Sequence, residues 1–482
     1  MNYSTTGSST TLGIVEKIVS GFQQGIASLN WEWLDKLAKS SILSILSKVN
    51  RGELRIEQGN ESWDFGSPYL LDRVNGPPQT LHVTIRVLKN SFWKRLFTHA
   101  DFGFSDSYML DEVEVSSLND LFRIFILNRQ VLNEMSTSVS PIIRALSYIA
   151  NSRLANSLKG SPSNISAHYD LPTSVFNAFL SRDLTYSCAI FDKDAKFEVG
   201  DLLEERPIVP PQKSLDEARV MPPDDLERGQ IAKLRLIAER ARLKGGIRVL
   251  EIGCGWGSFA MLAAREYGAE VDTITISEEQ LHDVRRRIEV AGLSNKIRVH
   301  FLDYRNLPSS FHHAFDAVVS IGVMEHVGIE FMTDWFKSMS WAMKREGSFK
   351  VFTMSTVPDT RWHLYSTEVD FVRKYIYPGG QLSSVYTLVK NIRDAGLNVN
   401  SIEDIGPHYA RTLREWSYRF QRNFESHIKP AMKSQYPFLS EQDIKIFERK
   451  FIYYFAYSEA GFAMRSISDH VFTLTREANL NL

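Results

Sequence analysis

Three alternate glycines, Gly253, Gly255 and Gly257, separate a short apolar run at 248–252 from a helical pattern. Glycine lets the backbone turn sharply there and approach a ligand where any Cβ would collide. The open N–H groups of the following helix would face that ligand. The spacing differs from the G-x-G-x-x-G pattern of dinucleotide sites, and Glu251 lies two positions before the first glycine. The pattern favours S-adenosylmethionine, whose cationic groups attract carboxylates, over a dinucleotide.

Further polar side chains follow the other apolar runs of this region. They are Thr275 and Gln280 after the second run, Asp303 and Tyr304 after the third, and Glu325 and His326 after the fourth. We expect Thr275 and Gln280 near the ribose and Asp303 with Tyr304 near the adenine amino group. Each also has a structural explanation, since Thr275 and Asp303 suit turn or helix caps. Their shared position after strand ends favours a binding site.

Strands and helices alternate through this half of the chain. Strands are predicted at 248–252, 270–276, 297–302, 317–321 and 348–354, and helices at 226–243, 259–267, 278–291 and 331–343. Such alternation predicts an α/β fold with a doubly wound, mostly parallel sheet. The ligand should lie at the carboxyl ends of its strands.

The composition sets limits on compartment and partners. The chain has 482 residues and a net charge of −1, which gives no reason to expect nucleic acid as a partner. Its two cysteines, Cys188 and Cys254, are too few for a disulfide framework and favour a reducing compartment. Residues 1–11 lack the pattern of a signal peptide, and no run reaches about 18 apolar residues. We expect a cytoplasmic protein.

The first third of the chain predicts a smaller α+β domain. Helical spacing covers 12–48 and 118–158, whereas 52–101 contains short β-like runs. We place this domain at 1–160 and the larger domain at 161–482, with a proline-rich loop at about 203–223. The helices at 12–48 and the basic and aromatic segment around Trp93 suit either a membrane surface or packing within their own domain.

Eight motifs occur in an order that resembles cyclopropane-fatty-acyl-phospholipid synthases, a family that includes mycolic acid methyltransferases and plant cyclopropane synthases. They are HYDL at 168–171, YSCAIF at 186–191, VLEIGCGWG at 249–257, TISEEQ at 275–280, DYR at 303–305, MEHVG at 324–328, YIYPGG at 375–380 and GPHY at 406–409. The resemblance covers roughly residues 160–470. Upstream, NSFW at 90–93 and GFSDSYM at 103–109 resemble the N-terminal lipid-interacting domain of the bacterial synthases.

The resemblance implies a seven-stranded Rossmann-like methyltransferase domain with helical insertions. It implies methyl transfer from S-adenosylmethionine to a cis double bond of a phospholipid acyl chain, followed by proton loss and ring closure. It also implies a peripheral membrane enzyme, and a homodimer by analogy with relatives. The implied cofactor-binding residues are Tyr186, Ser187, Glu251, Gly253, Gly255, Gly257, Thr275, Gln280, Asp303 and Tyr304.

In this family a bound bicarbonate serves as the base. The positions that match its ligands are Cys188, Ile321, Glu325 and Tyr409, and a fifth, a histidine in the bacterial pattern, aligns with Phe352. That departure puts bicarbonate in question. Without the family context, Cys188 and Tyr409 would be ordinary core residues.

Several readings stay open. Proton loss along another course would give a methylene or methyl-branched acyl chain instead of a ring. Small-molecule N-methylation fits the C-terminal region but not the resemblance of the N-terminal domain, and a non-catalytic cofactor-binding scaffold does not explain Glu325. The aromatic segments 416–424 and 451–462 suit either a core or the lining of an acyl site.

Overall fold

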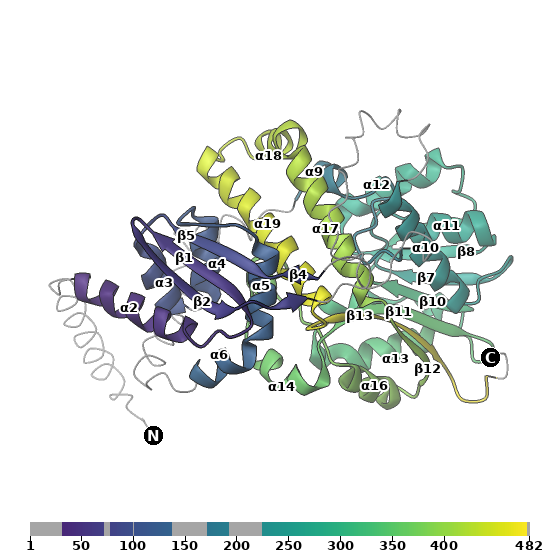
Figure 1. Ribbon diagram of the computed structural model, residues 1–482. Helices are drawn as coiled ribbons and strands as arrows, with labels where there is room; N and C mark the ends of the chain where they lie inside the picture. The colour runs from purple at the N-terminus through teal and green to yellow at the C-terminus, as the bar shows by residue number, and fades with distance from the viewer. Residues whose placement is uncertain (1–30, 72–77, 100, 137–170, 192–223, 480–482) are drawn as a thin grey trace, which may run out of the picture.

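The computed structural model describes residues 31–71, 78–99, 101–136, 171–191 and 224–479. It has a four-stranded and a seven-stranded sheet, with two-stranded β3 (Leu70–Leu71) and β4 (Gln79–Thr80) beside the former. Figure 1 shows the N-terminal α+β module at the left, the large α/β sheet at the right, and helix α19 (Glu441–Ala463) between them.

The seven-stranded sheet is doubly wound and mostly parallel, as predicted. Its strands are β7 (Arg248–Ile252), β8 (Glu270–Thr275), β9 (Ile297–Phe301), β10 (Ala317–Ile321), β11 (Phe349–Thr356), β12 (Asn398–Asp404) and β13 (Ser468–Thr475). They lie in the order β12-β13-β11-β10-β7-β8-β9. The five strands from β7 to β11 are parallel, and their predicted bounds are right to within two residues. β13 is antiparallel to both of its neighbours.

Helices cover both faces of this sheet. Val249 packs with Leu234 of α10 (Asp225–Arg240) and Phe259 of α11 (Ser258–Tyr267). Its neighbour Leu250 points the other way and packs with Trp335 of α13 (Met332–Ala342). α12 (Glu278–Val290) lies on the first face and α16 (Val385–Asp394) on the second. The structure therefore confirms a Rossmann-like α/β fold.

The N-terminal module is a smaller α+β unit. β1 (Gly52–Gln58), β2 (Glu61–Ser67), β5 (His82–Val87) and β6 (Val113–Val115) form its sheet, in the order β2-β1-β5-β6. Its helices are α2 (Trp31–Leu46), α3 (Ser91–His99), α4 (Asp101–Met109), α5 (Leu118–Leu127) and α6 (Arg129–Ser136). The predicted boundary near 160, the helical part of 137–158 and the proline-rich loop at 203–223 lie outside the described residues.

The helices α17 (Gly406–Asn423) and α19 join the two halves. A single hydrophobic core runs from the sheet of the N-terminal module to Trp416 and Phe451 on these helices. Glu459 of α19 accepts hydrogen bonds from Arg414 of α17 at 3.0 Å and from Asn119 of α5 at 2.8 Å. The aromatic C-terminal segments therefore pack in this core, and they hold the N-terminal module against the large sheet.

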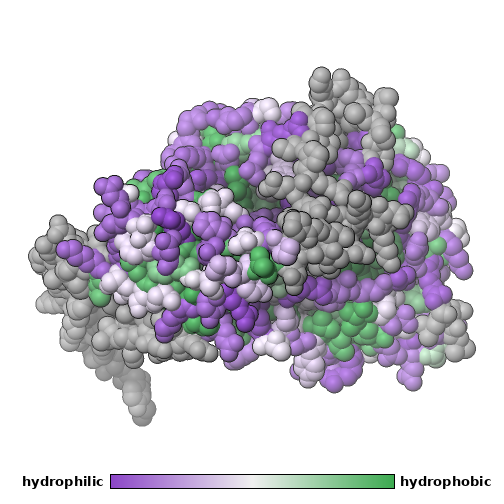
Figure 2. Space-filling model, viewed as in Figure 1, coloured by the Kyte–Doolittle hydropathy of each residue, from purple (hydrophilic) through white to green (hydrophobic). Residues whose placement is uncertain are grey.

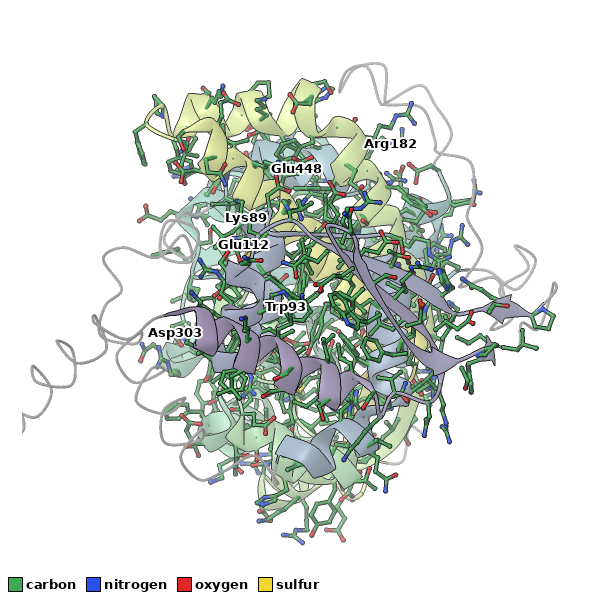
Figure 3. The ribbon with its side chains drawn as sticks, turned by 60° about the vertical axis from the view of Figure 1, so that its left-hand side comes forward. Lys89, Trp93, Glu112, Arg182, Asp303 and Glu448 are labelled. Carbon is green, nitrogen blue, oxygen red and sulfur yellow. The ribbon has the colours of Figure 1, made fainter. Side chains whose placement is uncertain are left out.

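Trp93 does not form the lipid-facing surface considered from the sequence. Phe92 and Trp93 are only 1% and 2% exposed, and the Trp93 indole N–H donates to Gln58 Oε1 at 3.0 Å. In Figure 3 Trp93 lies beside α2, whose Ala38 and Ile42 are also buried in this core. Phe92 and Trp93 therefore fill the module's interior, which is the packing alternative considered from the sequence.

The described part of the predicted N-terminal helices, α2, packs on its own module, while residues 12–30 lie outside the described residues. Within the described ranges no helix combines the length and apolarity needed to cross a membrane.

We predict that Trp93→Ala lowers the free energy of unfolding by about 3–5 kcal/mol, because it empties a core position. Leu88→Ala is the matched control, since Leu88 lies in the same segment but is 45% exposed. It should change stability by less than about 1 kcal/mol. Denaturant unfolding measures both variants. A Trp93→Ala protein of unchanged stability that binds lipid vesicles more weakly would contradict this account.

Candidate functional site

The glycine turn between β7 and α11 combines two constraints. Gly253, Gly255 and Gly257 have positive φ angles of 84°, 48° and 84°. A Cβ on Gly253 would lie 2.4 Å from Val323 Cγ2, and one on Gly257 would lie 3.0 Å from Val284 Cγ1. A Cβ on Gly255 would meet no atom within 4 Å. Packing therefore requires the outer two glycines, whereas a side chain at Gly255 would meet open space just before α11.

Thr275 and Gln280 form a connected pair at the end of β8. Thr275 Oγ1 donates to Gln280 Oε1 at 3.0 Å and accepts the Ser277 N–H at 3.1 Å. Between them Ile276 is 74% exposed, which is unusual for a large aliphatic residue beside a strand end. The sequence analysis did not single out this exposure, although the place of Ile276 between Thr275 and a helix cap was the available signal.

Asp303 acts as a turn cap, which is the structural explanation that the sequence offered. Its carboxylate accepts the Arg305 N–H at 2.9 Å and pairs with the Arg305 guanidinium. The hydrogen bond from Arg305 lowers the pKa of Asp303. Tyr304 is partly buried against the core that contains Leu250. A contact between these two residues and adenine stays a prediction.

The chain at 181–191 is held against the glycine turn without regular secondary structure. Arg287 of α12 donates to the carbonyl oxygens of Asp183, at 3.2 Å, and of Trp256, at 2.7 Å. The Ser258 hydroxyl also donates to the Asp183 carbonyl. These contacts bring the predicted Tyr186–Ser187–Cys188 motif to the start of α11.

A buried lysine and a buried glutamate lie on the same face of the sheet. Lys233 Nζ of α10 donates to Ser187 Oγ at 2.7 Å, and burial lowers the pKa of Lys233 to about 8. Burial raises the pKa of Glu251 to about 8, opposed by the charge of Lys233. Glu251 is 3% exposed on β7 and pairs with Thr273 and Val319 of the neighbouring strands. The structure thus links Glu251 to Lys233, and its contact with the cofactor stays a prediction.

Glu325 lies in the short helix η6 (Met324–His326), immediately past β10. Its Oε1 accepts the Ser355 N–H at 2.9 Å, and its carbonyl oxygen accepts the Gln381 N–H at 2.7 Å. The residue is half-buried, but its other carboxyl oxygen, Oε2, is enclosed and has no hydrogen-bond partner among the described residues. Burial raises the pKa of Glu325, against the opposing effect of the Ser355 N–H. Such a carboxyl is suited to acid–base or electrostatic work.

The other predicted catalytic residues gather beside it. Cys188, Ile321 and Tyr409 pack in one core cluster, and Cys188 Sγ donates to Ile405 O at 3.6 Å. Burial raises the pKa of the Cys188 thiol well above its usual value, so this cysteine is neutral. Burial also raises the pKa of Tyr409, and the charge of Glu325 adds to that shift. The structure therefore brings the four predicted residues into one neighbourhood.

The family model for mycolic acid cyclopropane synthetases matches residues 156–472. The chain belongs to this family. It is 30% identical over 386 residues to a cyclopropane-fatty-acyl-phospholipid synthase of Escherichia coli K12, an alignment that spans 80% of this chain and 85% of the relative. It is 28% identical to a tuberculostearic acid methyltransferase of Mycobacterium tuberculosis, across 80% of this chain and 81% of that protein.

Solved structures agree with this assignment. A mycolic acid cyclopropane synthase complexed with S-adenosylhomocysteine and CTAB is 25% identical, with a TM-score of 0.50 over 66% of this chain and 98% of that one. A coclaurine N-methyltransferase at 15% identity, with a TM-score of 0.53 over 78% of this chain and 99% of that one, shares the fold alone. The protein is an S-adenosylmethionine-dependent methyltransferase. The contact of Gly255 with its cofactor stays a prediction.

Phe352 of this methyltransferase points away from the face of the sheet on which Cys188 lies. It is fully buried, and its ring stacks on Phe472 with centroids 4.7 Å apart and an interplanar angle of 3°. It packs in the core that contains Leu250, whereas its neighbour Val351 packs on the opposite face with Cys188. Phenylalanine has no hydrogen-bond donor to offer an anion. The residue that replaces the family histidine therefore does not fit bicarbonate.

An aromatic wall, formed by Tyr186, Tyr377, Tyr454 and Trp416, lines the same neighbourhood. The Tyr186 ring is centred 4.9 Å from Trp416 and 6.4 Å from Tyr377, whose hydroxyl lies 3.4 Å from that of Tyr454. Tyr409 packs edge-on against Trp416, with centroids 5.9 Å apart. Aromatic faces attract cations. Sequence reasoning identified Tyr186 but not the set, because its members come from distant segments.

We predict that Gly255→Ala weakens S-adenosylhomocysteine binding by at least about tenfold, which is roughly 1.4 kcal/mol. The new methyl group would enter the open space that the cofactor needs. Gly59→Ala is the matched control, because Gly59 also has a positive φ, of 58°, and open surroundings, but lies in the N-terminal module. Both should lose about 1–2 kcal/mol of stability through left-handed backbone strain. Calorimetric titration that finds equal affinity for the two variants would contradict this placement.

Proposed function

We propose that this methyltransferase modifies a cis double bond in a phospholipid acyl chain and closes a cyclopropane ring. The enclosed carboxyl of Glu325, beside the aromatic wall, is the observation that carries the proposal. The names of the Escherichia coli and Mycobacterium tuberculosis relatives, which both refer to fatty acyl products, support it.

The chemistry requires an aligned alkene, exclusion of water and stabilisation of a cation. S-adenosylmethionine supplies an electrophilic methyl group, but an alkene is a poor nucleophile and must be held in line with it. Water must be kept from the cation that forms. Tyr186, Trp416 and Tyr377 can face that cation, and Glu325 places a carboxyl close by that is held in position by the Ser355 N–H.

A phospholipid acceptor in a bilayer requires an enzyme surface that docks on the membrane. An acyl chain in a bilayer has already left water, so its burial in the protein adds little net affinity. We therefore propose a cytoplasmic enzyme that docks on the membrane. Figure 2 shows a face where hydrophilic residues dominate and apolar side chains form separate groups. Exposed apolar residues occur at Leu364 of α14 (Asp359–Thr367), at Val369 and at Tyr386 of α16. A homodimer remains part of the proposal by analogy only.

The direct test is incubation of the purified protein with labelled S-adenosylmethionine and vesicles of unsaturated phospholipid. Mass analysis of the acyl chains should find a gain of one CH2 and loss of the double bond. A gain of CH2 with the unsaturation kept would indicate a methylene or methyl-branched product instead. Label in a small amine, with none in lipid, would contradict the proposal.

We predict that Glu325→Gln reduces turnover by at least about 100-fold. Glutamine keeps the acceptor for the Ser355 N–H but removes the negative charge, so S-adenosylhomocysteine binding should stay nearly unchanged. Glu330→Gln is the matched control, because Glu330 is an exposed glutamate in the same loop. Steady-state rates and calorimetric titration measure both effects. A Glu325→Gln enzyme with the wild-type rate would refute the assignment.

A further inference from the structure

We propose that Asp469 is the base that removes the proton from the transferred methyl group, in the place where the family resemblance expects bicarbonate. This inference rests on the proposed function, because it names the group that completes the ring closure. Asp469 was not among the residues singled out from the sequence.

The antiparallel direction of β13 puts Asp469 at the reactive edge of the sheet. β13 begins where the parallel strands end, and Asp469 pairs with Ser355 of β11, whose N–H donates to Glu325. The Asp469 carbonyl accepts the Ile405 N–H at 2.8 Å, and the Ile405 carbonyl accepts from Cys188 Sγ. Asp469 is thus the sheet partner of the residue that holds Glu325, and on its other side it is hydrogen-bonded to Ile405, which accepts from Cys188.

The side chain of Asp469 is on the face that carries the site. Strand side chains alternate, so Asp469 points to the same side as Val471, which packs with Cys188. Asp469 is 3% exposed, and Lys233 reaches this face from α10. A charged carboxyl so well shielded from water is costly unless opposite charges or hydrogen-bond donors face it.

The charges around Asp469 are those of the predicted site. Burial raises the pKa of Asp469 well above its usual value, and the negative charge of Glu325 raises it further. Lys233 and the His470 N–H oppose this shift, and Asp404 adds weakly to it. The charge of Asp469 in turn raises the pKa values of Tyr409 and Cys188. A positive charge in the site would lower the pKa of both carboxyls and favour their ionised forms.

Bicarbonate fits poorly among these groups. It would add a negative charge beside Glu325 and Asp469, which further disfavours the ionised form of both carboxyls. The histidine that would help to hold it is replaced by Phe352, which is stacked in another core. A carboxylate that belongs to the chain does the same work without binding a second anion.

The proposed step balances in atoms and charge. Methyl transfer leaves a new CH3 on one alkene carbon and a positive charge on the other. The Asp469 carboxylate takes one proton from this CH3, and the electrons of the broken C–H bond form the C–C bond that closes the ring. Asp469 becomes a neutral carboxylic acid and later returns the proton to solvent.

A positioning role for Asp469 is the alternative, since its charge also acts on Lys233, which holds Ser187. The two roles differ in their dependence on an external base. A positioning residue leaves the proton acceptor in place, so a small carboxylate cannot replace it. If Asp469 is the base, a small carboxylate can take its place in a variant whose side chain at 469 is shortened, such as Asp469→Ala.

The first experiment uses the wild-type enzyme in buffer freed of carbon dioxide and bicarbonate, with unsaturated phospholipid vesicles. We expect the rate of ring formation to stay the same when bicarbonate is added back. A rate that falls on depletion and recovers on addition would overturn the inference and leave the proposed function intact. If the wild type puts no label into lipid, the proposed function fails, and this inference fails with it.

The second experiment compares Asp469→Asn and Asp469→Ala with the control Glu403→Gln. Glu403 lies on the adjacent strand β12 and pairs with Arg240, so this control removes a negative charge from the neighbouring strand. We expect both Asp469 variants to lose at least about 100-fold in ring formation, and formate or bicarbonate to restore part of the rate of Asp469→Ala. Thermal unfolding and S-adenosylhomocysteine binding check that the variants fold. Wild-type rates in Asp469→Asn, or a folded, slow Asp469→Ala that neither anion rescues, would overturn the inference. If the variants do not fold, the first experiment tests the inference, through the effect of bicarbonate on the rate of ring formation by the wild type.

Discussion

Buried charge at the carboxyl edge of the large sheet is the constraint on which the rest of the structure depends. Glu325, Asp469 and Glu251 are acidic groups whose pKa values burial raises, and Lys233 is the buried cation that opposes the shifts of the latter two. Such groups are stable in a protein only when donors and opposite charges face them. The Ser355 and His470 N–H groups and the position of Lys233 on α10 meet part of that need, while Oε2 of Glu325 and Oε2 of Glu251 have no hydrogen-bond partner among the described residues.

This charge arrangement suits a reaction that passes through a cation. The acidic groups and the aromatic wall face the same neighbourhood as the glycine turn, so a positive charge there is favoured by both. The helices α17 and α19 supply Tyr409, Trp416 and Tyr454, and α19 also holds the N-terminal module through Glu459 and Asn119. The aromatic side of the site is therefore built on the same helices that join the two halves.

Much of the fold and part of the site followed from local sequence patterns. The glycine turn, Thr275 and Glu325 all come directly after apolar runs, so their position at one sheet edge follows from the alternation of strands and helices. Asp469 could not be found in this way, because its place depends on β13 entering the sheet antiparallel, far along the chain. Trp93 shows where local pattern could not decide: its basic and aromatic neighbourhood suited a membrane surface or a core, and long-range packing against α2 and Gln58 buries it. The roles of the individual site residues remain proposals.

The central claim is that the site takes a proton from the transferred methyl group itself. S-adenosylmethionine that carries a CD3 group tests this claim most directly, through the deuterium content of the acyl product made by the wild-type enzyme. The account predicts that the product keeps two deuterium atoms and has no remaining double bond at the modified position. A product that keeps all three deuterium atoms would show that the proton leaves from the acyl chain, and it would contradict the account.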